Sequence, residues 1–377
     1  MRSLLKPLTA FTATLLFASE AAAGLFSLFD PIKANRAESF TLKTEAFIAD
    51  DPVSLHDLFN DWQGEYHPKD GTNIAIDDIR IDLGGSFKKF GYFGLTLRHH
   101  TFITASKDLT LLVWQQLNKK GFTVGKRYDL FIGVDGFEAD GIVYANSFTL
   151  IDNGSSKLEA GFGAELLRGR ETQEGFLDGY ALAVTDKDYD YSAVSDYRYS
   201  ENYLYNLDVT KPTGTGFTTH ISLKYRIDKA AFKLIINDLY GKIDWKRAPY
   251  SHVNINSSNK SYDENGFIIY NPTVSGVEKY IDYSQRLYTR SRAQASYSFT
   301  KESTVLIGSD YAKKEYFPYL KIDYTPAEYL KAGLFYESRF ESFGVDFLYK
   351  GFSIFLAAND FNDPSALALK LSYKHRF

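Results

Sequence analysis

The chain lacks cysteine, has a single methionine and, beyond its first residues, contains no long apolar run. Without cysteine it has no disulfide, thiolate metal site or cysteine nucleophile, and it cannot carry the lipid of a bacterial lipoprotein. A basic block is also missing. The chain has 43 Lys and Arg against 47 Asp and Glu, for a net charge of -4, which excludes nucleic acid as a partner. Because 44% of the residues are hydrophobic, the chain can bury apolar surface and is not a disordered protein.

The first 23 residues have the pattern of a secretory signal peptide. Arg2 and Lys6 give a positive start, residues 8–19 are apolar, and residues 21–23 are the small alanines that a signal peptidase reads. The apolar run is shorter than the roughly 20 residues that a helix needs to span a bilayer, which disfavours an uncleaved anchor. We therefore expect export with cleavage after Ala23, and we exclude a helical membrane protein.

From residue 39 to the end, apolar and polar side chains alternate in segments of roughly ten residues, each bounded by Gly, Asp, Asn, Pro or Lys. In residues 217–227, one face carries Phe, Thr, Ile, Leu, Tyr and Ile, and the other carries Thr, His, Ser, Lys and Arg. Short connections between such segments predict an antiparallel up-and-down arrangement of strands. Alternation also fits a soluble β-sandwich, so another feature has to separate the two folds.

The end of the chain supplies that feature. Residues 367–377 place hydrophobic or aromatic side chains on one face of the last strand, at Leu369, Leu371 and Tyr373, and the chain ends in Phe377. In this the sequence resembles the outer-membrane β-barrel proteins of Gram-negative bacteria, whose last strand ends in Phe and is recognised by the barrel-assembly machinery. His375 departs from the pattern, because a hydrophobic or aromatic residue is more usual there.

The resemblance covers residues 39–377 and identifies no specific family. It implies an all-β fold, a transmembrane antiparallel up-and-down β-barrel in the bacterial outer membrane, with lipid, lipopolysaccharide and the assembly machinery as partners. The strand-like segments predict about 16 strands, with a range of 14 to 18. A barrel exposes apolar side chains to lipid and polar ones to the lumen, which reconciles membrane insertion with a mean hydropathy of -0.28.

Several segments are assigned from this architecture. With Phe377 in the periplasm, residues 186–196, 246–286 and 359–364 are predicted as outer loops, and the turns at residues 228–229 and 350–351 fall on the periplasmic side. Aromatic residues near strand ends are expected at the two membrane interfaces, namely Trp245, Tyr250, Tyr324, Tyr349 and Tyr373.

The segment before the barrel, residues 24–38, is not strand-like. It is a periplasmic helix, a segment in the lumen or a disordered lead-in. Within the barrel, Gly161 and Gly163 are expected to let lumen-facing backbone pass bulky neighbours.

Residues with catalytic or metal-binding chemistry show no ordered spacing. The groups considered are His252 with Asn254, Ser257, Ser258 and Asn259; His99 with His100; and His56, Asp57, Asp61, His67 and Asp70. Neither a nucleophile with its base nor a metal-ligand pattern is recognisable, and hydrated loops explain these residues more simply. We therefore predict that the protein is not an enzyme and holds no cofactor or metal.

The charges expected in the lumen are the most informative functional feature. The predicted pore-lining residues are Lys224, Arg226, Arg290, Arg292, Lys321, Lys331, Arg339 and Lys370 in the C-terminal half and Asp129, Asp135, Glu159 and Glu165 in earlier strands. Opposed acidic and basic walls would create a transverse field that selects polar or charged solutes. The alternative is that these charges pair with one another and fill the interior.

These features favour a porin-like channel for small polar or anionic solutes. The main rival is a non-conducting surface or structural barrel that binds partners through its outer loops, and an outer-membrane enzyme comes third. A lumen blocked by residues 24–38 or 246–286 would favour the rival. The oligomeric state is open, with a porin-like homotrimer as one option.

Overall fold

The computed structural model describes residues 24–35, 38–88, 90–201, 208–257, 260–262, 268–270, 274–327 and 329–377. The predicted signal peptide, residues 1–23, lies outside the described residues, so its cleavage stays a prediction. The short helices are α1 (Pro31–Ala34), α2 (Leu55–Phe59) and α3 (Lys107–Leu117). In the first half of the chain the strands are β1 (Ser39–Asp50), β2 (Thr72–Phe87), β3 (Gly91–Ser106), β4 (Arg127–Asp152), β5 (Ser156–Ala183), β6 (Tyr189–Tyr199) and β7 (Thr213–Ile227).

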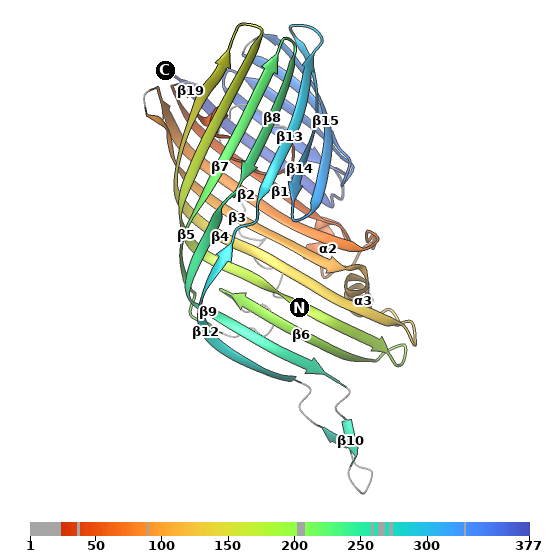
Figure 1. Ribbon diagram of the computed structural model, residues 1–377. Coiled ribbons are helices and arrows are strands. Elements are labelled where there is room, and N and C mark those ends of the chain that lie inside the picture. The colour runs from red at the N-terminus through yellow and green to blue at the C-terminus, as the bar shows by residue number, and fades with distance from the viewer. Residues whose placement is uncertain are drawn as a thin grey trace.

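The remaining strands are β8 (Ala230–Asn237), β9 (Gly241–Asn256), β10 (Lys260–Tyr262), β11 (Ile268–Tyr270), β12 (Val274–Arg286), β13 (Arg290–Ser298), β14 (Ser303–Ala312), β15 (Glu315–Ala327), β16 (Leu330–Glu337), β17 (Ser342–Tyr349), β18 (Phe352–Ala358) and β19 (Ala366–Arg376). In the described chain, 17 strands form one sheet, and the sheet closes because β1 pairs with both β2 and β19. All of these pairings are antiparallel (Figure 1). The predicted all-β, closed antiparallel barrel is confirmed.

Three positions in the barrel wall are shared by two strands each. β6 and β7 lie along the same edge of β5, β8 and β9 lie along β7, and β12 and β13 continue along β9 and β8. At each of these three positions, two consecutive strands lie end to end along the wall. The 17 strands of the described sheet therefore occupy 14 positions around the barrel. This number lies within the predicted range.

The two ends of the barrel differ. At the end that holds the C-terminus, hairpins close in tight turns, and Asp228 and Lys350 adopt left-handed backbone conformations (φ 47° for both) as such turns require. At the other end, strands including β5, β6, β9 and β12 run past the closed ring as an open wall (Figure 1).

Two segments predicted as outer loops are largely strand, which corrects that part of the prediction. Residues 186–196 contribute to β6, and residues 246–286 contribute to β9 and β12; within the latter segment, 258–259, 263–267 and 271–273 lie outside the described residues. The loop prediction failed because the alternation in these Tyr-rich stretches is weak, whereas pairing with neighbouring strands holds them extended.

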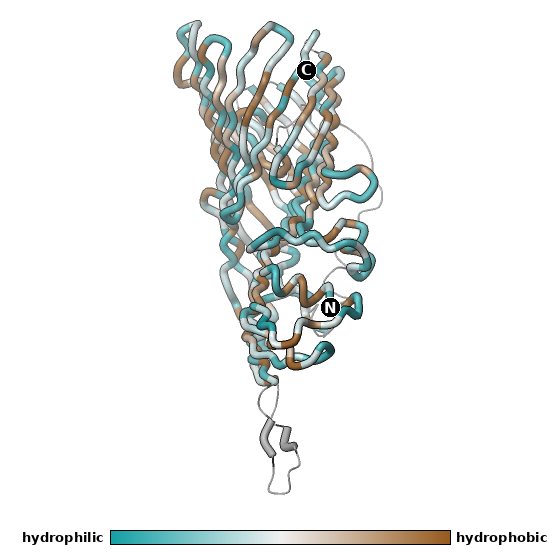
Figure 2. Tube along the Cα trace, turned by 90° about the vertical axis from the view of Figure 1, so that its right-hand side faces the viewer, coloured by the Kyte–Doolittle hydropathy of each residue, from teal (hydrophilic) through white to brown (hydrophobic). Residues whose placement is uncertain are grey.

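The burial pattern is that of a membrane barrel. Leu369 of β19 is 37% exposed, while the next residue, Lys370, is 4% exposed. Leu334 and Phe335 of β16 show the same alternation, and hydrophobic and hydrophilic residues alternate along the strands in Figure 2. The outer face is thus largely apolar, and charged side chains face inward together with buried aromatic residues such as Phe335.

Trp245, predicted at a membrane interface, is fully buried inside the barrel, where its Nε1 donates to Gln285 Oε1 at 2.9 Å. That interface prediction is wrong for Trp245, because the residue lies on the lumen side of β9 and packs with Ile243 and Leu287. Proximity to a strand end does not say which face a side chain occupies.

Helices α2 and α3 cover the outer face of the sheet near the open wall. Leu112 of α3 packs with Tyr128 and Leu130 of β4 and with Ala181 of β5. Residues around α2 pack on Ile48 of β1. In the described ranges, none of the helices is long and apolar enough to cross a membrane.

Candidate functional site

Residues 24–35, called the plug below, lie inside the barrel. Leu25, Phe26, Leu28, Phe29 and Ile32 are each at most 5% exposed. Phe26 packs edge-on against Phe47 of β1 and Phe317 of β15, with ring centroids 5.3 and 4.9 Å apart. The plug ends in α1, which follows directly after Asp30.

Side chains of the wall accept hydrogen bonds from the backbone N–H groups of the plug. The Ser27 amide donates to Asp78 Oδ2 at 2.7 Å, and the Phe29 amide donates to Asn237 Oδ1 at 2.7 Å. The Phe26 amide donates to Asp310 Oδ2 at 3.2 Å. The plug is not part of the sheet, so its backbone N–H groups have no neighbouring strand to pair with. The wall side chains supply acceptors for these N–H groups, which would otherwise be buried without a hydrogen bond at a cost in free energy.

Cations of the wall bind the carbonyl oxygens of the plug. Arg292 Nη2 and Lys370 Nζ both donate to the Phe26 carbonyl, at 2.9 and 2.8 Å. Lys43 Nζ donates to the carbonyl of Leu28 at 3.4 Å. The plug is therefore held largely by charge-assisted hydrogen bonds to side chains of several strands.

Two glycines of β5 make room for the plug. A Cβ at Gly161 would lie 2.8 Å from the Ile32 amide nitrogen, and a Cβ at Gly163 would lie 3.0 Å from the Phe29 ring. The prediction that these glycines let lumen-facing backbone pass bulky neighbours is confirmed, and the bulky neighbours are residues of the plug.

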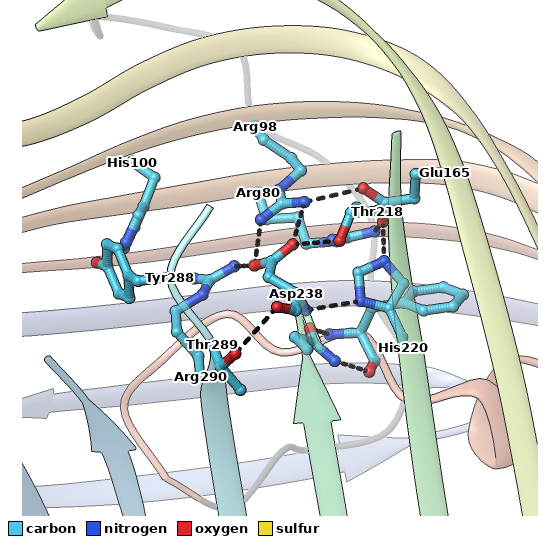
Figure 3. Close-up of polar contacts among 12 residues, drawn as sticks. Arg80, Arg98, His100, Glu165, Thr218, His220, Asp238, Tyr288, Thr289 and Arg290 are labelled. Atoms are coloured by element: carbon cyan, nitrogen blue, oxygen red, sulfur yellow. Dashed lines mark hydrogen bonds and ion pairs between the residues drawn. The ribbon is translucent and has the colours of Figure 1, made fainter. Parts of the chain in front are cut away.

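A network of buried charges crosses the lumen beside the plug (Figure 3). Arg80 binds Glu165 at 2.6 Å, and Arg98 binds Glu165 at 3.0 Å and Asp238 at 2.7 Å. Arg290 forms ion pairs with both Asp238, at 3.2 Å, and Asp78, at 2.8 Å. Asp78 also accepts the hydrogen bond from the Ser27 amide. The network therefore shares a carboxylate with the plug, and Arg80 also lies 4.9 Å from the centroid of the Phe29 ring.

Histidines and hydroxyls complete this network. His220 Nε2 lies 3.0 Å from Glu165, and His100 Nδ1 lies 3.1 Å from Asp78, with the His100 ring also contacting Tyr288. Thr218 Oγ1 donates to Asp238 Oδ1 at 2.9 Å. Such a network leaves few charges uncompensated, which is the condition for burying them.

Asp30 connects the plug to β8 through an ion pair with Lys233. Burial by itself would raise the pKa of Asp30, but the Lys233 ammonium, with a smaller contribution from Lys33, outweighs burial and holds this pKa below its ordinary value. The carboxylate is therefore charged at neutral pH and binds the plug to the wall electrostatically.

Four predicted pore-lining residues meet at the plug or its network: Arg290, Arg292, Lys370 and Glu165. A second group, Lys321 and Lys331, lies along the neighbouring wall, where Lys321 pairs with Asp346 and Lys331 lies 2.8 Å from Asp323.

Other predicted pore-lining residues lie apart from the plug. Glu159 and Lys224 are register partners on β5 and β7 towards the C-terminal end, and Arg226 is exposed near the following turn. Towards the opposite end, Asp135 pairs with Lys313 and Arg339 lies 2.7 Å from Asp51.

Asp129 lies on the open wall, where its side chain is 75% exposed and 3.3 Å from Arg127. Of the predicted assembly signal, Leu369 and Phe377 are exposed on the outside and Leu371 and Tyr373 are half-buried. Their recognition by the assembly machinery stays a prediction.

Acidic and basic residues are interleaved rather than separated into two walls. The early strands β2 and β3 contribute Arg80 and Arg98, and the late strands β14 and β17 contribute Asp310 and Asp346. The sequence reasoning missed these residues, although the alternation of Asp78, Arg80 and Asp82 along β2 places all three on one face and could have identified them.

An apolar cavity of about 370 Å³ lies between α3 and the sheet. Its walls include Leu109, Val113 and Leu117 of α3 opposite Ile103, Ile132 and Val134 of β3 and β4. Asp77 and His99, 3.2 Å apart, also line it, and by alternation they face away from the lumen side occupied by Asp78 and His100. Ala49, Ile74 and Ile76, which belong to the hydrophobic cluster around Leu25 and Phe26 of the plug, also line this cavity.

The polar groups considered from the sequence do not assemble as metal sites in the part of the chain that the structure describes, where no three His, Cys, Asp or Glu side chains are grouped to hold an ion. His56 contacts Asp57 at 3.4 Å and His67 contacts Glu65 at 2.9 Å, and both histidine side chains are largely exposed. His252 lies 3.3 Å from Asp196.

No family model matches the chain, and no curated protein matches it. Among solved structures it is similar to a TodX monoaromatic hydrocarbon channel mutant, with 10% identity over 96% of this chain and 97% of that one and a TM-score of 0.46. The Ralstonia pickettii toluene transporter TbuX matches with 8% identity over 92% of each chain and a TM-score of 0.32. A Pseudomonas aeruginosa FadL homologue matches with 10% identity over 95% of this chain and 97% of that one, with a TM-score of 0.22.

Proposed function

We propose that the chain is a gated outer-membrane channel for small polar or anionic solutes, held closed at rest by the plug. The observation that carries this proposal is the plug itself, a short segment that occupies the lumen and is bound there by side chains of the wall. Contacts of this kind exchange individually with water or solute, whereas a strand of the barrel leaves only when its whole ladder breaks.

The packing around the plug supports a movable element. Cavities of about 180 and 50 Å³ lie against Leu28, Asp30 and Lys33 on one side and against Phe29 and Ala34 on the other. A lumen sealed for purely structural reasons would be expected to pack at the density of a protein core. The charged walls beside the plug favour polar rather than apolar solutes.

Single-channel recording in planar bilayers tests the proposal. We expect the mature chain to be mostly closed and a variant without residues 24–35 to conduct in stable steps. The deletion must first be shown to refold, by its heat-modifiable gel mobility and its β-sheet circular dichroism. A refolded deletion variant that stays silent would contradict the channel and support the non-conducting barrel, the rival that a blocked lumen favours.

A disulfide that reversibly locks the plug to the wall tests the same movement without deleting residues 24–35. Ser222 Oγ lies 3.3 Å from the Ile32 amide, and the chain contains no cysteine of its own, so Ile32→Cys with Ser222→Cys introduces the only thiols. Oxidised protein should stay closed, and a reductant should restore gating. Each single cysteine variant serves as the control, and equal activity before and after reduction would argue against plug movement.

The apolar cavity under α3 supports a second candidate function, capture of a small apolar compound near the outer end. Its volume of about 370 Å³ suits a small ligand. Val113→Trp should fill it and abolish binding of a fluorescent naphthylamine probe, whereas Val124→Trp, at an exposed loop position, should not. Equal binding by both variants would remove this candidate.

A further inference from the structure

The cavity of about 180 Å³ beside the plug is lined mainly by cations. Six of them, Lys33, Lys43, Lys233, Arg292, Lys321 and Lys331, face two carboxylates, Asp30 and Asp323. Lys43, Arg292 and Lys321 have carboxylate partners, Glu45, Asp310 and Asp346, that are not among the lining residues. Counted with these partners, six cations meet five carboxylates, an excess of one positive charge. The cavity volume exceeds the ~30 Å³ of one water several times.

One of the two carboxylates belongs to the plug. Asp30 reaches into this cavity and pairs with Lys233, so the plug occupies an anion site of the wall with its own side chain. The ammonium of Lys233 offers three donors in total. A diffusible anion in the cavity would compete for these donors and repel the Asp30 carboxylate.

The other carboxylate indicates which anion fits. Asp323 Oδ2 lies 2.8 Å from Lys331 Nζ, and its buried Oδ1 lies 3.1 Å from Lys321 Nζ in an ion pair that is not a hydrogen bond, so Oδ1 can still accept one. An ionised carboxylate only accepts hydrogen bonds. An oxyanion that keeps a proton at neutral pH, as phosphate does, can donate to this oxygen, whereas sulfate cannot.

From this geometry we infer that inorganic phosphate binds in the cavity between the plug and the wall and releases the plug by displacing Asp30 from Lys233. This inference rests on the proposed gated channel and names both its ligand and its trigger. Cations supply the attraction, and Asp323 supplies the discrimination between phosphate and sulfate.

Phosphate binding is measured by titration calorimetry on the refolded mature chain in detergent, with sodium sulfate at equal ionic strength as the comparison. We expect phosphate to bind at least tenfold more tightly than sulfate. Lys233→Gln should weaken phosphate binding at least tenfold, and Asp323→Asn should remove the preference over sulfate. Lys242→Gln, at a half-exposed ion pair with Asp244 away from the cavity, should change neither. Absence of phosphate binding, or equal binding of the two anions, would overturn the inference.

Plug release is measured separately from conduction. Ser27 is fully buried in the plug, so the thiol of a Ser27→Cys variant should react slowly with a maleimide. We expect phosphate, but not chloride at equal ionic strength, to accelerate this reaction at least fivefold, and Asp30→Asn to accelerate it without phosphate. Phosphate that binds but leaves the rate unchanged, or slows it, would overturn the release step. Because labelling needs no ion current, failure here is distinguishable from a barrel that does not conduct.

Discussion

At the scale of single residues, the lumen is organised by buried charges whose partners come from distant strands. Arg290 is the clearest case, because it contacts Asp78 from β2 and Asp238 from the segment between β8 and β9. Removing a buried charge leaves its partners unpaired, which costs far more than losing an exposed ion pair.

Replacing Arg290 by Met should therefore lower the free energy of unfolding by about 3–5 kcal/mol, since two buried carboxylates lose a cation. The measurement is urea unfolding in lipid vesicles, followed by tryptophan fluorescence. Arg168→Met is the matched control, because Arg168 pairs with Asp140 on the exposed outer side and should cost about 0–1 kcal/mol. Similar losses for the two variants would refute a structural role for the network.

Asp30 makes closure depend on pH in one direction. Because its pKa is held below the ordinary value, its stabilising contribution is fully present above the unfolded-state pKa of about 3.9 and is lost as pH falls through the lower folded-state pKa. The contribution of Asp30 should thus make open probability rise below about pH 4. Asp30→Asn should be more open at neutral pH and lack this rise, whereas identical pH profiles for both proteins would exclude Asp30 as the group responsible.

At the scale of elements, the plug and the last strand carry the functional expectations. The plug fits against β5 only because β5 has glycine where α1 and the Phe29 ring approach it. The last strand exposes hydrophobic side chains to lipid and is followed directly by an exposed Phe377. Each feature leads to a substitution whose effect is confined to that element.

Gly161→Ala should displace the plug while leaving the barrel folded, since the new Cβ would lie 2.8 Å from the Ile32 amide nitrogen. We expect a several-fold higher open probability in planar bilayers and unchanged heat-modifiable gel mobility. Gly121→Ala is the control, because a Cβ there meets its nearest atom at an ordinary 3.5 Å. A variant that gates like the unaltered chain would show that the plug does not need this contact.

Phe377→Ser should reduce assembly in cells but not refolding of purified protein. Phe377 is 70% exposed, so little packing is lost, whereas the resemblance to outer-membrane barrels makes this residue part of the assembly signal. The measurements are the amount of folded barrel in outer-membrane fractions and the refolding yield in detergent. Phe361→Ser removes a similarly exposed aromatic side chain outside the last strand. Equal losses in cells for both variants would contradict the signal.

At the scale of the whole molecule, the two ends of the barrel differ, and this difference predicts its direction in the membrane. Tight turns and the C-terminus occupy one end, and the open wall with α2 and α3 occupies the other (Figure 1). In outer-membrane barrels the short turns lie in the periplasm and the longer connections lie outside the cell, so the end with the open wall is expected to face the cell exterior.

An epitope inserted at the exposed turn of residues 186–188 should therefore be detected by antibody on intact cells, and one at Lys229 only after permeabilisation. Both sites lie in exposed connections between strands, so neither insertion should prevent folding. Detection of the Lys229 epitope on intact cells would reverse the orientation.

The sequence by itself determined that the chain is an antiparallel barrel and which face of most strands each side chain occupies. The barrel was predicted from the resemblance carried by the last strand, since alternation by itself also fits a β-sandwich. The face of each side chain follows from backbone geometry alone, because successive side chains of an extended chain alternate whatever the partner strand is. The inward placement of Arg290, Lys321 and Lys370 is of this kind.

Only the tertiary structure decided what those side chains meet. That residues 24–35 fill the lumen, that Arg290 faces Asp78, and that 17 strands of the described sheet share 14 positions all depend on closure of the barrel, which brings together residues far apart in the chain. Alternation carries no information about register or about a segment inside the ring. The sequence therefore indicated a charged interior, but the pairing of those charges with a plug required the folded chain.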